Sequence, residues 1–137
     1  MNIINHFFRK DSYPPVVDES KVGTYTGLYH SGAGYFYDEV LEYRVWSHPE
    51  MGALDTFAGE DYFHAFSNYE QALYFSRSRL GTEKPIVLVL QKEWIDEPEP
   101  GIFIHKKKPR ITEWRVEWLK NNKRTTDSIK NFLSNKK

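Results

Sequence analysis

One short stretch places a histidine beside a flexible backbone at the end of a predicted strand. The run Thr24 to His30 is rich in β-branched and aromatic residues, and it stops at Ser31-Gly32-Ala33-Gly34, where glycines permit a turn. A histidine in such a position offers a hydrogen-bond donor to a ligand hydroxyl group. Tyr29, His30 and Ser31 are therefore candidate ligand-binding residues, and the alternative is an ordinary histidine at the edge of a loop.

A second candidate group lies on the predicted strand Arg110 to Leu119. Side chains alternate along a strand, so Glu113, Arg115 and Glu117 share one face, while the tryptophan-bearing face should belong to the core. Two carboxylates two residues apart can share protons across a cleft, which makes Glu113 and Glu117 candidate catalytic residues. The structural alternative is an exposed surface whose charges compensate one another.

Charge is distributed unevenly along the chain, although the formal net charge is zero. From residue 105 to the end, eleven lysines and arginines stand against three acidic residues, so this stretch carries +8 and residues 1–104 carry −8. The basic end predicts an acidic protein or nucleic-acid partner, unless the fold brings the two halves together and cancels the field. Lys106, Lys107, Lys108 and Arg110 form either a phosphate- or partner-binding tip or a solvated turn that discourages edge pairing.

Metal and disulfide chemistry finds little support in the sequence. The chain contains no cysteine, which excludes disulfides and zinc–thiolate sites and fits a reducing compartment. The close groupings of histidine with acid are His48 with Glu50 and Asp61 with His64. Neither matches a helical metal pair or a facial triad, so no metal site is predicted.

The length of 137 residues predicts a single domain over 1–137, with an N-terminal arm at 1–20 and a core at 21–137. The longest aliphatic run, Ile86 to Leu90, is far too short to span a membrane. Met1 to Lys10 lacks the long apolar segment of a secretory signal. We therefore expect a cytoplasmic protein without a membrane partner.

The clearest local signal is a capped helix. Ser67-Asn68-Tyr69-Glu70 matches a capping box, the helix is expected to run through Arg79, and Gly81 stands where a helix C-terminal glycine belongs. A short strand at Asp61 to Phe66 precedes it, and a buried apolar strand at Pro85 to Leu90 follows. Strand, helix and strand together predict a βαβ-like unit.

The rest of the chain predicts strands, a connection and a last helix. The expected strands are Val40 to Trp46, Gly101 to His105 and Arg110 to Leu119, with a stiff acidic connection over Asp96 to Gly101 and a last helix capped by Asp127 or Ser128. Glu42 and Arg44 share one face of the first strand, which is a candidate to pair with the strand of Glu113. Aromatic residues make up 16% of the chain and either fill the core or stack on a nucleobase. The predicted fold is α+β, with a mixed or antiparallel sheet of about five or six strands and the capped helix on one face.

Tyr29-His30-Ser31-Gly32 resembles a motif of ADP-ribosyltransferases of the diphtheria-toxin type, in which a strand carries Tyr-His-Gly-Ser/Thr. Ser31 stands where that family has glycine. The stretch Tyr62 to Ser67, with His64 inside it, and the following Tyr69 to Tyr74 resemble the strand and helix that supply stacking aromatic residues in the family.

This resemblance implies an NAD-binding site and a role for each matching residue. His30 would hold the ribose, Tyr62 with Tyr69 would stack on nicotinamide, and either Glu113 or Glu117 would stabilise an oxocarbenium-like centre electrostatically. The choice between the two glutamates stays open.

A second resemblance covers nearly the full length. The matching segments are Tyr43 to Pro49, His64 to Glu70, Trp94 to Gly101 and Ile111 to Leu119. They resemble a group of small bacterial proteins often labelled GNAT-type N-acetyltransferases, which implies acetyl-CoA as cofactor. That family holds the CoA pyrophosphate on a loop Arg/Gln-x-x-Gly-x-Gly/Ala that opens a helix. The nearest stretch, Arg77 to Thr82, has a different spacing and closes a helix, so no CoA-binding residue is assigned.

The sequence is therefore compatible with three classes of function. The first is an acetyl-CoA-dependent transferase, and the second is an ADP-ribosyl-type NAD-binding domain that uses His30. The third is a non-catalytic module that binds a protein or nucleic acid through its charge polarity. Whether the protein is an enzyme is left open at this point.

Overall fold

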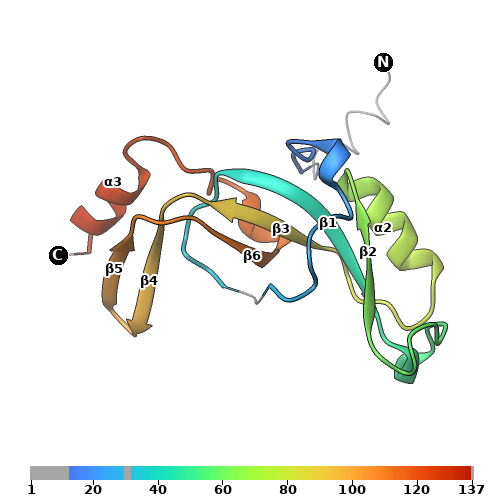
Figure 1. The fold of residues 1–137 in the computed structure, drawn as a ribbon. Helices are drawn as coiled ribbons and strands as arrows, with labels where there is room; N and C mark the ends of the chain where they lie inside the picture. The colour runs from blue at the N-terminus through green and yellow to red at the C-terminus, as the bar shows by residue number, and fades with distance from the viewer. Residues whose placement is uncertain (1–12, 30–31, 137) are drawn as a thin grey trace, which may run out of the picture.

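The centre of the fold is a four-stranded antiparallel sheet with the strand order β2-β1-β3-β6 (Figure 1). The computed structural model describes residues 13–29 and 32–136. The sheet consists of β1 (Glu39–Ser47), β2 (Tyr62–Phe66), β3 (Ile86–Gln91) and β6 (Arg110–Arg115), and a separate antiparallel hairpin consists of β4 (Trp94–Glu99) and β5 (Ile102–Lys106). Together with α2 (Tyr69–Ser78) and α3 (Ser128–Ser134), these strands confirm the predicted α+β fold.

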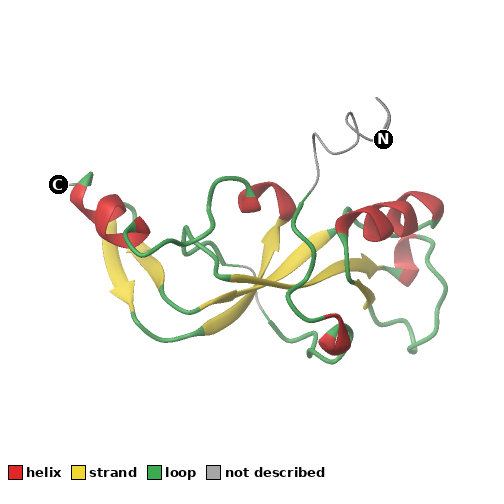
Figure 2. Cartoon of the chain, turned by 90° about the horizontal axis from the view of Figure 1, so that it is seen from above, coloured by secondary structure: helices red, strands yellow, loops and turns green. Residues whose placement is uncertain are grey.

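The two α-helices lie at opposite ends of an elongated molecule (Figures 1 and 2). α2 packs on β1 and β2, whereas α3 lies beside the β4–β5 hairpin. Among the residues that the structure describes, none of the helices combines the length and the apolar character needed to cross a bilayer.

β3 forms the interior of the sheet because its residues are apolar on both sides. Val87, Leu88 and Val89 are all fully buried, as the continuous apolar run predicts. β2 and β3 are both antiparallel to β1 and hence parallel to each other. α2 therefore connects two parallel strands, which confirms the βαβ-like unit, with β1 inserted between them.

α2 begins one residue later than the predicted capping box. The side chain of Asn68, rather than that of Ser67, is the N-cap and accepts a hydrogen bond from the backbone N–H of Gln71 at 2.9 Å. Asparagine caps a helix as well as serine does, and the carbonyl oxygen of Ser67 instead accepts the N–H of Val16 at 3.2 Å. The inward face of α2 is centred on Ala72, which is fully buried.

The segment after α2 passes so close to its neighbours that a side chain would not fit. Gly81 has a φ of +76°, and a Cβ atom there would lie 2.3 Å from the backbone nitrogen of Ala53. Glycine is therefore needed both for the left-handed backbone and for the close approach.

The tryptophan-bearing face of β6 belongs to the core, as predicted: Trp114 is only 2% exposed and Thr112 is also buried. The strand is shorter than predicted, because it ends at Arg115 and Val116–Leu119 forms a 3-10 turn. The last pair of the β3–β6 ladder is Ile86 with Arg115, and the next residue of β3 would be Pro85, which has no backbone N–H to donate.

Two other predicted segments differ in the structure. The acidic stretch Asp96 to Gly101 is not only a connection, because β4 continues through Glu99. Its proline at position 98 is tolerated in a two-stranded hairpin, where the register shifts between Asp96 and Glu99. The predicted strand at Thr24 to His30 has no strand geometry in residues 24–29, which instead lie against the sheet.

The described part of the N-terminal arm packs on the domain. Val16 is buried, and the N–H of Val17 donates to the carbonyl oxygen of Val40 at 2.8 Å. The core on the α2 side of the sheet includes Val16, Tyr43, Val45, Ala72, Val87, Val89, Trp114 and Val116, with Phe66, Tyr69 and Phe75 packed against them.

Candidate functional site

The sheet face turned away from α2 carries charged residues in its interior. Side chains alternate along β1, so Tyr43 and Val45 point into the core while Glu42, Arg44 and Trp46 point to the other face. Glu42 and Arg44 are nonetheless fully buried. Glu42 and Arg44 thus form a buried pair, and buried charges need partners.

Arg44 has three acceptors around its guanidinium. Its Nε donates to Glu42 Oε2 at 2.7 Å, its Nη1 to Glu113 Oε2 at 2.9 Å, and its Nη2 to the carbonyl oxygen of Thr26 at 2.6 Å. The guanidinium also lies 4.1 Å from the ring centroid of Phe63 and 5.9 Å from that of Tyr29. Arg44 therefore joins β1, β6 and the segment before Tyr29 in one buried network.

Glu113 is held through one oxygen only. Its Oε2 accepts hydrogen bonds from Arg44 and from the indole Nε1 of Trp46, the latter at 3.0 Å. Among the described residues, no hydrogen bond or ion pair uses Oε1, and 12% of the side chain is exposed. The strand of Glu113 does not pair with β1, because β3 lies between them, and Arg44 spans that gap. The contacts among the described residues thus fix this carboxylate through Oε2.

Residues 23–29 cover this face closely. The N–H of Gly23 donates to Glu42 Oε1 at 2.8 Å, and burial together with the charge of Glu42 raises the pKa of Tyr25. A Cβ atom on Gly27 would lie 3.0 Å from Phe63, so this glycine lets the backbone approach the rings. The segment that precedes His30 is thus attached to the network of Glu113 through Tyr29, while His30 and Ser31 lie outside the described residues.

The second predicted glutamate lies elsewhere. Glu117 belongs to the 3-10 turn, 66% of its side chain is exposed, and its nearest cation is Arg115 at 3.9 Å. Glu113 and Glu117 therefore lie on different elements, and it is Glu113 that contacts the guanidinium of Arg44, which lies 5.9 Å from the ring centroid of Tyr29.

The predicted stacking residues lie on the α2 side of the sheet. Tyr62 and His64 line a pocket of about 240 Å³ at the end of α2, where burial, followed by the charge of Arg79, lowers the pKa of His64. Tyr69 packs edge-on against Tyr13, with ring centroids 4.7 Å apart. The structure therefore does not bring Tyr62, His64 or Tyr69 together with Glu113.

The predicted basic tip divides into two parts. Lys107 and Lys108, between β5 and β6, are exposed, and Lys106, the last residue of β5, is half-buried. Arg110 instead lies over the ring of Trp94, 3.6 Å from its centroid, and donates to Gln91 at 2.6 Å. Burial lowers the pKa of Arg110, so this residue belongs to the packing and not to the exposed tip.

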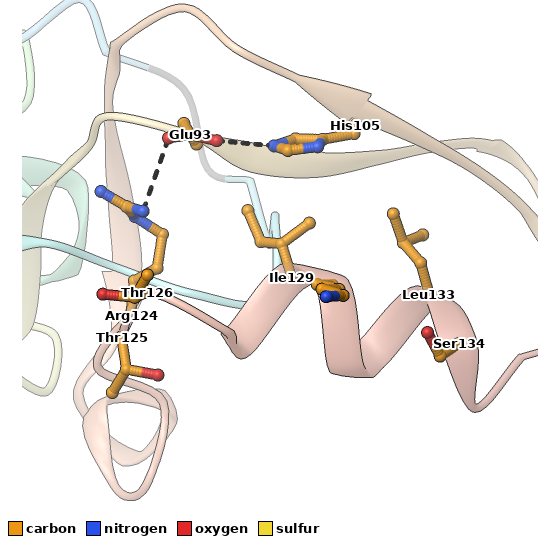
Figure 3. Close-up of a pocket in the computed structure, with 9 residues that line it drawn as sticks. Glu93, His105, Arg124, Thr125, Thr126, Ile129, Leu133 and Ser134 are labelled. Carbon is orange, nitrogen blue, oxygen red and sulfur yellow. Dashed lines mark hydrogen bonds and ion pairs between the residues drawn. The ribbon is translucent and has the colours of Figure 1, made fainter.

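A pocket of about 360 Å³ lies between the hairpin and α3, over Ile129 and Leu133 (Figure 3). Glu93 spans its upper wall, with Oε1 on His105 Nε2 at 2.7 Å and Oε2 on Arg124 Nη1 at 3.5 Å. The same arginine donates to Asp38 at 2.8 Å. Because both oxygens of Glu93 are already engaged, these groups tie the hairpin to the body of the fold.

Other histidine and acid groups do not form a ligand set. Within residues 13–29 and 32–136, no three or more histidine and acidic side chains are placed to hold a metal ion. His48 approaches Asp61 through Nδ1 at 2.9 Å and Glu83 through Nε2 at 2.6 Å, so both of its ring nitrogens are occupied.

The central residue of the candidate site was not recognised from sequence. Arg44 and Trp46 read as alternate residues of an ordinary strand, and nothing in their spacing shows that they reach Glu113 across β3. The signal that the sequence offers is an arginine two residues from an acid on one face of a strand. Comparison with known proteins finds no matching family model, no similar curated protein and no similar solved structure.

Proposed function

We propose that this chain is an ADP-ribosyl-type NAD-binding domain in which Glu113 is the reactive carboxylate. The observation that carries this proposal is the anchoring of Glu113 through one oxygen by Arg44 and Trp46, while the other oxygen has no partner among the described residues. Tyr29, which belongs to the segment that resembles the family motif, reaches the same arginine.

A carboxylate placed in this way suits the departure of nicotinamide from a ribose. Positive charge develops on the ribose carbon as the bond to the nicotinamide nitrogen breaks, and its electron pair leaves with nicotinamide. Glu113 Oε1 stabilises that charge, and the acceptor then bonds to the ribose carbon and loses its proton. Because Arg44 and Trp46 already fix the carboxylate, it needs no reorganisation during the reaction.

The geometry favours this proposal over an acetyl-CoA-dependent transferase. A CoA pyrophosphate loop has to open a helix so that free backbone N–H groups meet the phosphates. α2 ends at Ser78, so the nearest loop-like stretch, Arg77 to Thr82, presents carbonyl groups of a helix C-terminus.

Two ligand titrations separate these classes. Millimolar NAD should raise the melting temperature, and millimolar acetyl-CoA should leave it unchanged. Nicotinamide release from NAD should fall about 100- to 1,000-fold in Glu113→Gln, by analogy with the loss of one preorganised electrostatic group. Glu117→Gln should release nicotinamide at the wild-type rate because its side chain is exposed.

The amide of Glu113→Gln can still accept the hydrogen bonds of Arg44 and Trp46, so this variant is expected to fold. A folded protein that neither binds NAD nor releases nicotinamide would overturn the proposal. Equal rates for Glu113→Gln and wild type would remove Glu113 from the reaction.

A further inference from the structure

The β4–β5 hairpin ends in a strand edge that pairs with no other strand among the described residues. β5 pairs with β4 on one side, and these two strands form a sheet of their own. β5 lies at the end of the molecule farthest from α2 (Figure 1). An unpaired edge presents backbone N–H and C=O groups to which another strand can be added.

The backbone groups of Phe103 and His105 point to this edge. The N–H of Ile95 donates to the carbonyl oxygen of Gly34 at 3.1 Å, so Ile95 faces away from β5. In an antiparallel ladder, two directly opposite residues turn their backbone groups either toward each other or both outward. His105 is opposite Ile95, so it faces away from β4, and Phe103, two residues along β5, has the same orientation.

One face of β5 is apolar and open to solvent. Ile102 is 52% exposed and Ile104 is 42% exposed. Phe103 and His105 point to the other face, where Phe103 packs edge-on against Phe132 of α3 and His105 lines the pocket above that helix. Two exposed isoleucines on an unpaired strand favour the addition of a further strand.

Charge is separated along the same face of the hairpin. Glu99 is exposed beside the turn and shares a face with Ile102, its opposite residue in the ladder. Lys106, four residues after Ile102, ends β5 at the other end of this face. Four residues of strand separate the acid from the base by about 13 Å, so they cannot pair within one hairpin.

We propose that β5 pairs antiparallel with β5 of a second copy of this chain, about a two-fold axis at Ile104. The two copies of Ile104 then lie opposite each other, and Ile102 lies opposite Lys106 of the second copy. The stem of that lysine covers Ile102, and its ammonium group meets Glu99 on the same face. The two-fold axis repeats the contact, so one dimer gains two ion pairs.

The charge pattern selects this arrangement over a parallel one, which would set the two copies of Lys106 against each other. The pairing does not rest on the proposed function, because it uses the hairpin and leaves β6, which carries Glu113, as it is. A single short strand buries little surface, so the dimer belongs to the weak class, with a Kd of about 100 μM.

Analytical ultracentrifugation over a concentration series tests the dimer. Glu99→Lys brings two lysines together at each contact, and Lys106→Glu brings two glutamates together, so each variant should weaken self-association about tenfold. Lys107→Glu is the matched control, because it makes the same change of charge on the neighbouring exposed residue, beyond the end of β5. This control should associate like wild type.

An equimolar mixture of the two weakened variants is the decisive measurement. In the mixed dimer both contacts again join a lysine to a glutamate, so the mixture should associate like wild type although neither variant does so alone. Wild-type protein gives a second readout that needs no variant. The amides of Phe103 and His105 should exchange severalfold more slowly at about 1 mM than at about 10 μM protein.

A wild-type chain that stays monomeric up to about 1 mM would overturn the proposal and leave this edge to solvent or to a strand of another protein. A mixture of folded variants that associates no better than its components would overturn it as well. Concentration-independent exchange at Phe103 and His105 would place any dimer contact on another surface.

Discussion

Arg44 shows how one residue can organise a sheet face. Its guanidinium meets two carboxylates and a carbonyl oxygen, and none of its side chain is exposed. Replacing a buried ion pair by apolar residues is often tolerated, but removing one partner leaves an uncompensated charge behind. The role of Arg44 in positioning Glu113 is therefore inseparable from its role in stability.

Arg44→Ala is expected to lower the free energy of unfolding by about 3–5 kcal/mol, because Glu42 is left buried without its cation. Urea denaturation of both proteins measures the difference. Arg115→Ala is the control and should change stability by less than about 0.5 kcal/mol, since its side chain is 71% exposed and its ion pair is long. A loss below about 1 kcal/mol for Arg44→Ala would show that Glu42 finds another partner.

At the scale of elements, His48 links two segments that are far apart in the sequence. Asp61 precedes β2 and Glu83 precedes β3, and one imidazole contacts both. The hydrogen bond to Asp61 and then that to Glu83 raise the pKa of His48 above its usual value near 6.5. Only the protonated ring can donate to both carboxylates at once.

Stability should therefore depend on pH in this region. Because the pKa of His48 is raised in the folded state, its contribution to the free energy of unfolding is fully present below about pH 6.5. This contribution is lost as the pH rises through the pKa of the folded protein. Because both carboxylates are about half exposed, the loss in the free energy of unfolding should be no more than about 1 kcal/mol. Urea unfolding of wild type and His48→Asn at pH 5.5 and pH 8.5 measures it. A difference between the two proteins that does not shrink with rising pH would contradict the assignment.

The elements that follow local rules were predictable, and those set by a partner strand were not. α2 and β3 carry their own signals, a cap and a continuous apolar run. The end of β6 depends on Pro85 in the neighbouring strand, and the site of Glu113 depends on β3 lying between β1 and β6. Alternation along β6 correctly separated Trp114 from Glu113, but no local pattern reveals which residue reaches across to a carboxylate.

At the scale of the whole molecule, the fold partly offsets the charge difference between its two sequence halves. Arg124, from the basic end, pairs with Asp38 and contacts Glu93, both from the acidic part. Lys107 and Lys108 stay exposed at the tip between β5 and β6, so a nucleic-acid or acidic protein partner for this tip remains a prediction. These two ion pairs attach the end that carries α3 to the rest of the fold, and Figure 3 shows the one between Arg124 and Glu93.

That attachment leads to a prediction about local stability. Glu93 joins His105 on β5 to Arg124 in the segment before α3, and the hairpin forms no ladder with the central sheet among the described residues. Glu93→Ala removes both contacts, so amide hydrogen exchange in β4, β5 and α3 should quicken severalfold while β1 and β3 keep their protection. Glu99→Ala, on the exposed part of the same hairpin, should exchange like wild type. Faster exchange throughout the central sheet would mean instead that hairpin, helix and sheet unfold as one cooperative unit.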